Sequence, residues 1–155
     1  MAQVYLLFFG LLVPKSINEG FFEYFITFNI HNRVSIFEDV KIARLFCKHI
    51  AVNEKKNQCK WLTWVLMPDH FHGLLQLGEK VQLSKVIAEF KGTTAYKINA
   101  ELDRKGKLWQ TSFYDHVLRE EENRKNIARY IVANPLRKGL VKDIKKYPYW
   151  NSIYL

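Results

Sequence analysis

Two histidines, His70 and His72, are separated by a single residue within an otherwise apolar stretch, residues 64–77. Side chains at positions i and i+2 of a β-strand project from the same face. A strand here would therefore place both imidazoles side by side and turn Phe71 toward the opposite face. Imidazole binds several divalent metals, so the pair suits one divalent ion. The same pair is also compatible with packing and hydrogen bonding alone, and both interpretations stay open at this point.

A nucleophile to match the histidines must come from elsewhere in the chain. There is no GxSxG elbow and no Walker loop, and the serines and threonines have no evident neighbouring base. Tyr130 and Asn134 are four residues apart on an expected helix, and such positions share one face. The amide oxygen of Asn134 suits a hard divalent cation, and Tyr130 offers a phenol that needs assistance to act as a nucleophile. An interfacial tyrosine and a helix C-cap before Pro135 fit the same spacing.

The surrounding pattern predicts the elements that would position these residues. Aromatic and β-branched residues, typical of strands, are concentrated in residues 21–32, 61–67, 70–77 and 108–118. Apolar residues recur at helical spacing in residues 40–52 and 84–102, and from the acidic run at 120–122 to Asn134. A polar turn is expected at residues 53–60, and residues 136–155 are expected to be a strapped-down tail. The order βαββαβ predicts an α+β, ferredoxin-like antiparallel sheet with an extra C-terminal helix that carries the tyrosine.

The length of 155 residues suits one domain, which we expect at residues 21–155 after an N-terminal extension at residues 1–20. The apolar run at residues 4–13 is too short to span a bilayer, which takes about 20 residues, and lacks signal-peptide features. An added strand or a poorly ordered leader is expected there. Cys47 and Cys59 form neither a disulfide framework nor a CxxC site, and Cys47 fits a buried free thiol. These features favour a cytoplasmic protein without a membrane partner.

The net charge of +9, from 24 Lys and Arg against 15 Asp and Glu, indicates a polyanionic partner. Nucleic acid is favoured over an anionic membrane surface, and over a merely basic protein. The basic residues form two groups. Around the second helix they are Lys85, Lys91, Lys97, Arg104, Lys105 and Lys107, and beside the tyrosine helix they are Arg124, Lys125, Arg129, Arg137 and Lys138. Aromatic side chains that could stack on exposed bases are Trp109, Phe113 and Tyr114.

Three separated motifs, LMPDHFHGLLQL, LWQTSFYDHVLR and ARYIVANPLRKGLV, occur in this order. Their sequence and spacing resemble the REP-associated branch of the single-tyrosine transposases, within the HUH endonuclease superfamily. The triplet His70-Phe71-His72 matches the HUH motif directly, and the resemblance covers roughly residues 21–149. It implies a metal-dependent single-stranded DNA endonuclease and strand transferase.

The resemblance also implies a role for each site residue. His70 and His72 would hold Mg²⁺ or Mn²⁺ against a DNA phosphate, with Asn134 as a third ligand. Tyr130 would attack that phosphate, which gives a 5′-phosphotyrosine link and a free 3′-hydroxyl. The implied partner is single-stranded DNA, usually an imperfect palindromic hairpin, bound by a monomer or a homodimer. The candidate DNA contacts are Lys91, Trp109, Tyr114, His116, Arg129 and Arg137.

Other assignments are weighed against these. Tyr114 competes with Tyr130 as the nucleophile, and His116 would then share its face. Asp69 either orients a ligand histidine or is simply a turn residue. Two other functions remain alternatives: a non-catalytic ferredoxin-like module that binds DNA or RNA hairpins, and a metal phosphoesterase that uses water.

Overall fold

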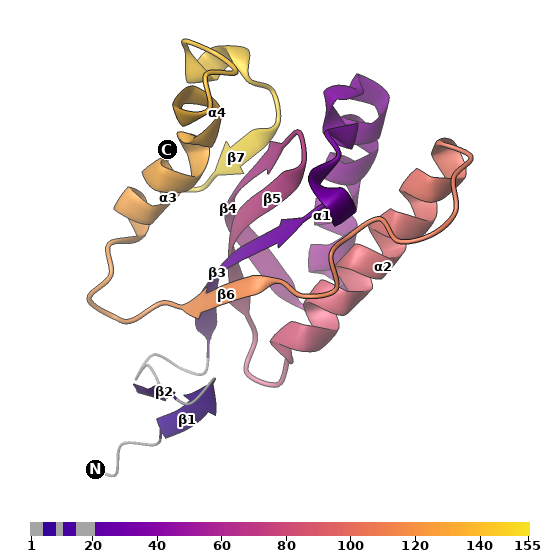
Figure 1. The fold of residues 1–155 in the computed structure, drawn as a ribbon. Helices are drawn as coiled ribbons and strands as arrows, with labels where there is room; N and C mark the ends of the chain where they lie inside the picture. The colour runs from indigo at the N-terminus through magenta and orange to yellow at the C-terminus, as the bar shows by residue number, and fades with distance from the viewer. Residues whose placement is uncertain (1–4, 9–10, 15–20) are drawn as a thin grey trace.

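The computed structural model describes residues 5–8, 11–14 and 21–155, and its main feature is a five-stranded antiparallel sheet (Figure 1). The strand order is β6-β3-β5-β4-β7. The strands are β3 (Phe22–Asn29), β4 (Cys59–Met67), β5 (His70–Leu77), β6 (Tyr114–Val117) and β7 (Trp150–Ser152). The first four with α1 and α2 have the βαββαβ order, so the predicted α+β, ferredoxin-like fold is confirmed.

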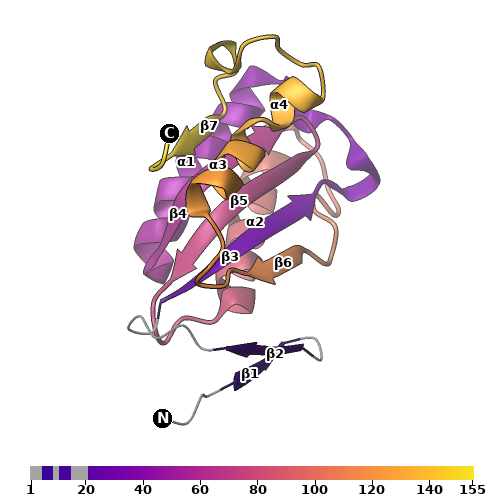
Figure 2. The same ribbon diagram turned by 90° about the vertical axis from the view of Figure 1, so that its left-hand side faces the viewer.

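Helices cover both faces of this sheet (Figure 2). On one face lie α1 (Val40–Asn57) and α2 (Leu83–Glu101), over a core that contains Phe28, Phe46 and Phe71. On the other lies α3 (Arg124–Val132), whose Ile131 packs with a smaller apolar cluster, and the short α4 (Asn134–Arg137) follows at once. We call these the α1/α2 face and the α3 face. The predicted extra C-terminal helix is thus present, and the structure places it on the face opposite α1 and α2.

Alternation along the central strands decides which residues belong to which face. In β3, Tyr24, Ile26 and Phe28 are buried on the α1/α2 face, and the intervening residues point to the α3 face. In β5, Phe71 is fully buried in the α1/α2 core. Its neighbours His70 and His72 must therefore point to the α3 face.

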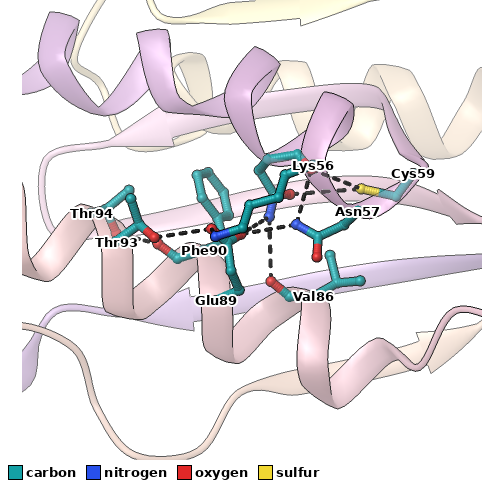
Figure 3. A network of polar contacts seen from close by, with 9 residues as sticks. Lys56, Asn57, Cys59, Val86, Glu89, Phe90, Thr93 and Thr94 are labelled. Atoms are coloured by element: carbon teal, nitrogen blue, oxygen red, sulfur yellow. Dashed lines mark hydrogen bonds and ion pairs between the residues drawn. The ribbon is translucent and has the colours of Figure 1, made fainter.

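Helix α1 extends five residues beyond the predicted end at residue 52, so the predicted turn at 53–60 is wrong. Polar residues of its last turns bind one carboxylate of α2 (Figure 3). Asn53 Nδ2 and Asn57 Nδ2 each donate to Glu89 Oε2 at 2.9 Å, and Lys56 Nζ lies 3.1 Å from Glu89 Oε1. These bonds give the polar residues partners inside the helix pair. Only Gln58, with φ 50°, separates α1 from β4.

The segment predicted as a strand at 108–118 is mostly a loop. Only Tyr114–Val117 form β6, while Trp109 makes an isolated bridge to Ile30. The ammonium of Lys91 fixes this loop by donating to the carbonyl oxygens of Gln110, Thr111 and Ser112 at 2.6, 3.2 and 3.2 Å. Because these carbonyls bind a side chain, they are not available to a strand ladder.

Helix α3 begins later than the acidic run at 120–122. Asn123 is its N-cap, and the Asn123 side chain accepts a hydrogen bond from the backbone N–H of Asn126 at 2.9 Å. Glu122 instead binds His116 and the backbone N–H of Arg119. The acidic run therefore closes the loop before α3 and does not form its first turn.

At the N-terminus, β1 (Tyr5–Phe8) pairs antiparallel with β2 (Leu11–Pro14) as a separate two-stranded sheet. The prediction for residues 1–20 otherwise lies outside the described residues. At the other end, β7 joins the sheet edge beside β4, which attaches the tail as predicted. Both cysteines are free and half-buried. Among the described residues no helix is long and apolar enough to cross a membrane.

Candidate active site

The two histidines lie together at the start of β5, directly after the two-residue turn from β4. Their ring centroids are 4.6 Å apart and the rings are nearly perpendicular, at 87°. His70 is buried, and the sheet register places Asn29 and Met67 opposite it. His72 is half-buried between Thr27 and Val65. The prediction that both imidazoles share one face is confirmed.

Asp69 fixes the orientation of His70. Asp69 Oδ1 lies 2.6 Å from His70 Nδ1, and Oδ2 lies 2.8 Å from Arg33 Nε. A carboxylate only accepts hydrogen bonds, so Nδ1 of His70 carries the proton and Nε2 of the neutral ring keeps its lone pair. Burial lowers the pKa of His70, against the opposing effect of Asp69. His70 is therefore mostly neutral near pH 7, the form that binds a metal.

Thr27 performs the matching role for His72, from the neighbouring strand β3. Thr27 Oγ1 lies 2.6 Å from His72 Nδ1. Burial, with His70 and Arg137 nearby, lowers the pKa of His72 to about 3, so this ring is also neutral. When Nδ1 donates to the threonine oxygen, Nε2 is left for another ligand. Each ring thus has a hydrogen-bond partner at Nδ1, as histidines that bind metals normally do.

Arg33 reaches this site from a strained loop. Asn32 and Arg33 both have left-handed backbones, with φ 58° and 56°, a conformation uncommon outside glycine. The guanidinium of Arg33 binds Asp69 and also donates to Asn29 Oδ1. The same guanidinium contributes to the low pKa values of His70 and His72. A positive charge is therefore held beside the histidine pair on the side of the β4–β5 turn.

Tyr130 lies on α3, over the same face of the sheet, and 56% of it is exposed. A chain of aromatic contacts connects it to the histidines. The Phe25 ring is 6.3 Å from the Tyr130 ring and 5.9 Å from the His72 ring, centroid to centroid. The phenol is exposed to solvent and can be reached by a large substrate, while its ring rests against the sheet.

Comparison with known proteins gives this arrangement a context. The family model described as "Transposase IS200 like" matches residues 21–134, which span strands β3 to β6, the histidine pair and the tyrosine helix. The chain belongs to this family. The match ends at Asn134, so it includes Tyr130 and excludes Arg137.

Individual relatives agree with this membership of the transposase family. The chain is 25% identical over 128 residues to the REP-associated tyrosine transposase of Escherichia coli, covering 81% of this chain and 73% of that protein. It is 29% identical over 94 residues to a Haemophilus influenzae protein assigned as a REP-associated tyrosine transposase. That match spans 54% of this chain and about half, 53%, of the relative.

Solved structures of related transposases share the fold. One, a REP-associated tyrosine transposase bound to a REP hairpin, matches with a TM-score of 0.71 at 21% identity. It covers 97% of this chain and 80% of that one. A transposase-like protein of Deinococcus radiodurans matches with a TM-score of 0.51 at 20% identity, over 70% of this chain and 87% of its own.

Asn134, which the sequence predicts as a third metal ligand, is the first residue of α4 and is buried. Its Nδ2 donates to the carbonyl oxygen of Ile131 at 3.3 Å. Within residues 21–155 its Oδ1 has no hydrogen-bond partner, so this oxygen is the atom that could bind a cation. In the described part of the chain, no three His, Cys, Asp or Glu side chains are grouped for a metal. The donor set is therefore two imidazoles plus at most an amide, which leaves positions for substrate oxygens.

Tyr114 and His116 are two residues apart on β6 and pair with Thr27 and Phe25, so both side chains point to the α3 face. Their surroundings differ. Tyr114 is 58% exposed, and its ring lies 6.1 Å from that of Phe25. His116 Nε2 lies 3.0 Å from a Glu122 carboxylate oxygen and helps to close the loop before α3. Tyr114 thus remains beside the site, and His116 is engaged in holding the loop.

The other predicted DNA contacts divide by face. Arg129 and Arg137 are exposed on α3 and α4. Trp109 is a correction: it is buried in the α1/α2 core, where its Nε1 donates to Thr94 Oγ1 at 3.0 Å, so it has no face for a base. Lys91 is a second correction. It lies on α2, on the far side of the sheet from the histidines, and its ammonium is used by three loop carbonyls.

Phe25, Thr27 and Arg33 belong to the site, yet the sequence did not single them out. The β3–β5 register brings Phe25 and Thr27 beside His72, and such a register cannot be obtained from one strand. Arg33 lies in a connecting loop with no periodicity. The available signal was the Phe-x-Thr alternation of β3, which placed both side chains on one face without saying which.

Proposed function

We propose that the transposase is a metal-dependent single-stranded DNA endonuclease and strand transferase, with Tyr130 as its nucleophile. The observation that carries the proposal is the position of an exposed tyrosine above the face that presents two neutral, oriented imidazoles. Family membership over residues 21–134 supports the same chemistry. A module that only holds a hairpin has no need of this combination.

In the proposed reaction the Tyr130 phenol oxygen bonds to the phosphorus of the scissile phosphodiester. The bond from phosphorus to the 3′-oxygen breaks, and that oxygen takes up a proton to replace the one lost by the phenol. The products are a 5′-phosphotyrosine link and a free 3′-hydroxyl. Because the phosphodiester is exchanged for a phosphotyrosine ester and is not hydrolysed, the 3′-hydroxyl of another strand can attack that ester and release Tyr130.

The proposed metal site consists of His70 Nε2, His72 Nε2 and Asn134 Oδ1. When bound, Mg²⁺ or Mn²⁺ would supply Lewis-acid neutralisation of the phosphate charge. The chain's own contribution is orientation. Asp69 and Thr27 hold the two rings by Nδ1, and lowered pKa values keep both rings neutral near pH 7, which leaves Nε2 unprotonated.

The proposed DNA surface is the α3 face, where Arg33 lies beside the histidine pair and where Arg129 of α3 and Lys138 after α4 are exposed. Exposed Tyr114 adds an aromatic ring on which an unpaired base could stack beside His72. The relative whose structure holds a REP hairpin supports an imperfect palindromic hairpin as the partner. The basic residues of α2 lie across the sheet and are not part of this surface.

The test is covalent capture with single-stranded oligonucleotides, each carrying an imperfect palindromic hairpin and a 3′ label. The label follows the strand that stays on the protein. With Mn²⁺ we expect a protease-sensitive adduct with the wild type and none with Tyr130→Phe, at unchanged hairpin affinity. Tyr96→Phe is the matched control, because Tyr96 is 73% exposed on α2, across the sheet from the site.

Three results would contradict the proposal. An adduct that persists in Tyr130→Phe and disappears in Tyr114→Phe would assign the nucleophile to Tyr114. Hairpin binding without any adduct in the wild type would favour the non-catalytic binding module. Free DNA ends with no adduct would indicate a metal phosphoesterase that uses water.

A further inference from the structure

Arg137 makes two direct contacts with Tyr130, which lies seven positions earlier in the chain. Its guanidinium carbon lies 4.1 Å from the centroid of the Tyr130 ring. Its Nη1 donates to the backbone carbonyl oxygen of Tyr130 at 2.9 Å. One arginine on α4 thus contacts both the ring and the backbone of a single residue on α3.

Phe25 contacts the same ring from the sheet, at 6.3 Å between centroids and 57° between planes. The tyrosine is otherwise exposed, and a solvent-facing side chain usually exchanges between rotamers within nanoseconds. Contacts from β3 and from α4 restrict this motion. The ring is therefore held by two elements that are far apart in the sequence.

We propose that Arg137 is a positioning residue that orients the Tyr130 phenol for attack, and not primarily a contact to DNA phosphate. This inference rests on the proposed function. A guanidinium above an aromatic ring is attracted by the negative charge of its π-face. Arg137 thus favours the ring position that the nucleophile needs.

The hydrogen bond to the backbone adds a second constraint. Tyr130 is in the last turn of α3, where carbonyl groups lack partners within the helix. By binding one of them, Arg137 links the end of α3 to α4. The hydrogen bond to the backbone is expected to affect the stability of the helix end, and the contact with the ring is expected to affect the reaction.

The experiment compares Arg137→Gln, Arg137→Lys and the control Arg44→Gln in single-turnover adduct formation at saturating hairpin oligonucleotide and Mn²⁺. Arg44 is exposed on α1, which covers the opposite face, so its variant removes the same charge away from the site. Misplacement of a reacting group costs up to about 100-fold, and we expect Arg137→Gln to be roughly 10- to 100-fold slower. Arg137→Lys, which keeps a cation near the ring, should recover part of the rate.

Hairpin affinity and thermal stability are measured on the same variants. We expect the hairpin Kd values of Arg137→Gln and Arg44→Gln to agree within about threefold, because each variant loses one positive charge whose effect on binding is screened by salt. A weaker Kd with an unchanged saturating rate would overturn it, and so would an Arg137→Lys variant as slow as Arg137→Gln. If the wild type forms no adduct, the proposed function fails first. An adduct formed equally fast by Arg137→Gln refutes the inference alone.

Discussion

Replacing Asp69 by asparagine tests whether its carboxylate prepares His70 to bind a metal. The Asp69 side chain is 21% exposed and lies 2.6 Å from His70 Nδ1 and 2.8 Å from Arg33 Nε. Asparagine keeps the shape and one acceptor oxygen, so the change mainly removes the negative charge. Such partners of ligand histidines are worth about 10- to 100-fold in metal affinity, or about 1.4 to 2.8 kcal/mol. Since the amide oxygen can still accept from Nδ1, we expect roughly tenfold weaker binding.

Isothermal titration of Mn²⁺ into wild type and Asp69→Asn at pH 7.5 measures this difference. Glu79→Gln is the control, because Glu79 is exposed in the loop after β5, at the opposite end of that strand from the histidines. Circular dichroism melting verifies that each variant is folded. If Asp69→Asn binds Mn²⁺ as tightly as the wild type and the control, the carboxylate does not prepare His70, and the reasoning is refuted.

Three further expectations concern packing and ionisation. Phe25→Leu removes the ring between Tyr130 and His72, so the adduct rate at saturating DNA should fall roughly tenfold; an unchanged rate would refute this role. Burial lowers the pKa of His72 to about 3, against about 6.5 in the unfolded chain, so the free energy of unfolding should decrease as pH falls from about 6.5 toward 3. Urea denaturation should show a smaller decrease in His72→Gln, and an equal one would count against the assignment. Burial raises the pKa of Cys47 and Cys59 to about 12, so both thiols should react with a disulfide reagent at pH 8 only after unfolding; rapid reaction of the folded protein would contradict their burial.

The face of each central strand could be predicted because it depends on local alternation. Because Phe71 is apolar, its side chain was expected in the core, and alternation then directs His70 and His72 to the opposite face of the sheet. The order of elements likewise followed from periodicity, and the structure contains the predicted ferredoxin-like sheet and tyrosine helix. The sequence did not predict that this helix covers the other face of the sheet.

What could not be predicted depends on partners distant in the sequence. The end of α1 looked like a turn because Asn53 and Asn57 are polar, and their partner Glu89 lies more than 30 residues away. Trp109 looked suited to base stacking, yet a buried hydrogen bond to Thr94 satisfies its indole. Lys91 looked like a phosphate contact, yet loop carbonyls bind it. Composition shows which side chains can bind DNA, but only tertiary contacts show which are free to do so.

The central claim, that Tyr130 carries the covalent link, can be tested most directly by peptide mapping of the adduct. After nuclease trimming, trypsin separates the two candidate tyrosines, because Tyr130 lies in the peptide of residues 130–137 and Tyr114 in that of residues 108–119. Each peptide contains one tyrosine. We expect the nucleotide mass on the 130–137 peptide, attached through a 5′-phosphate. The same mass on the 108–119 peptide, or on neither, would contradict the assignment.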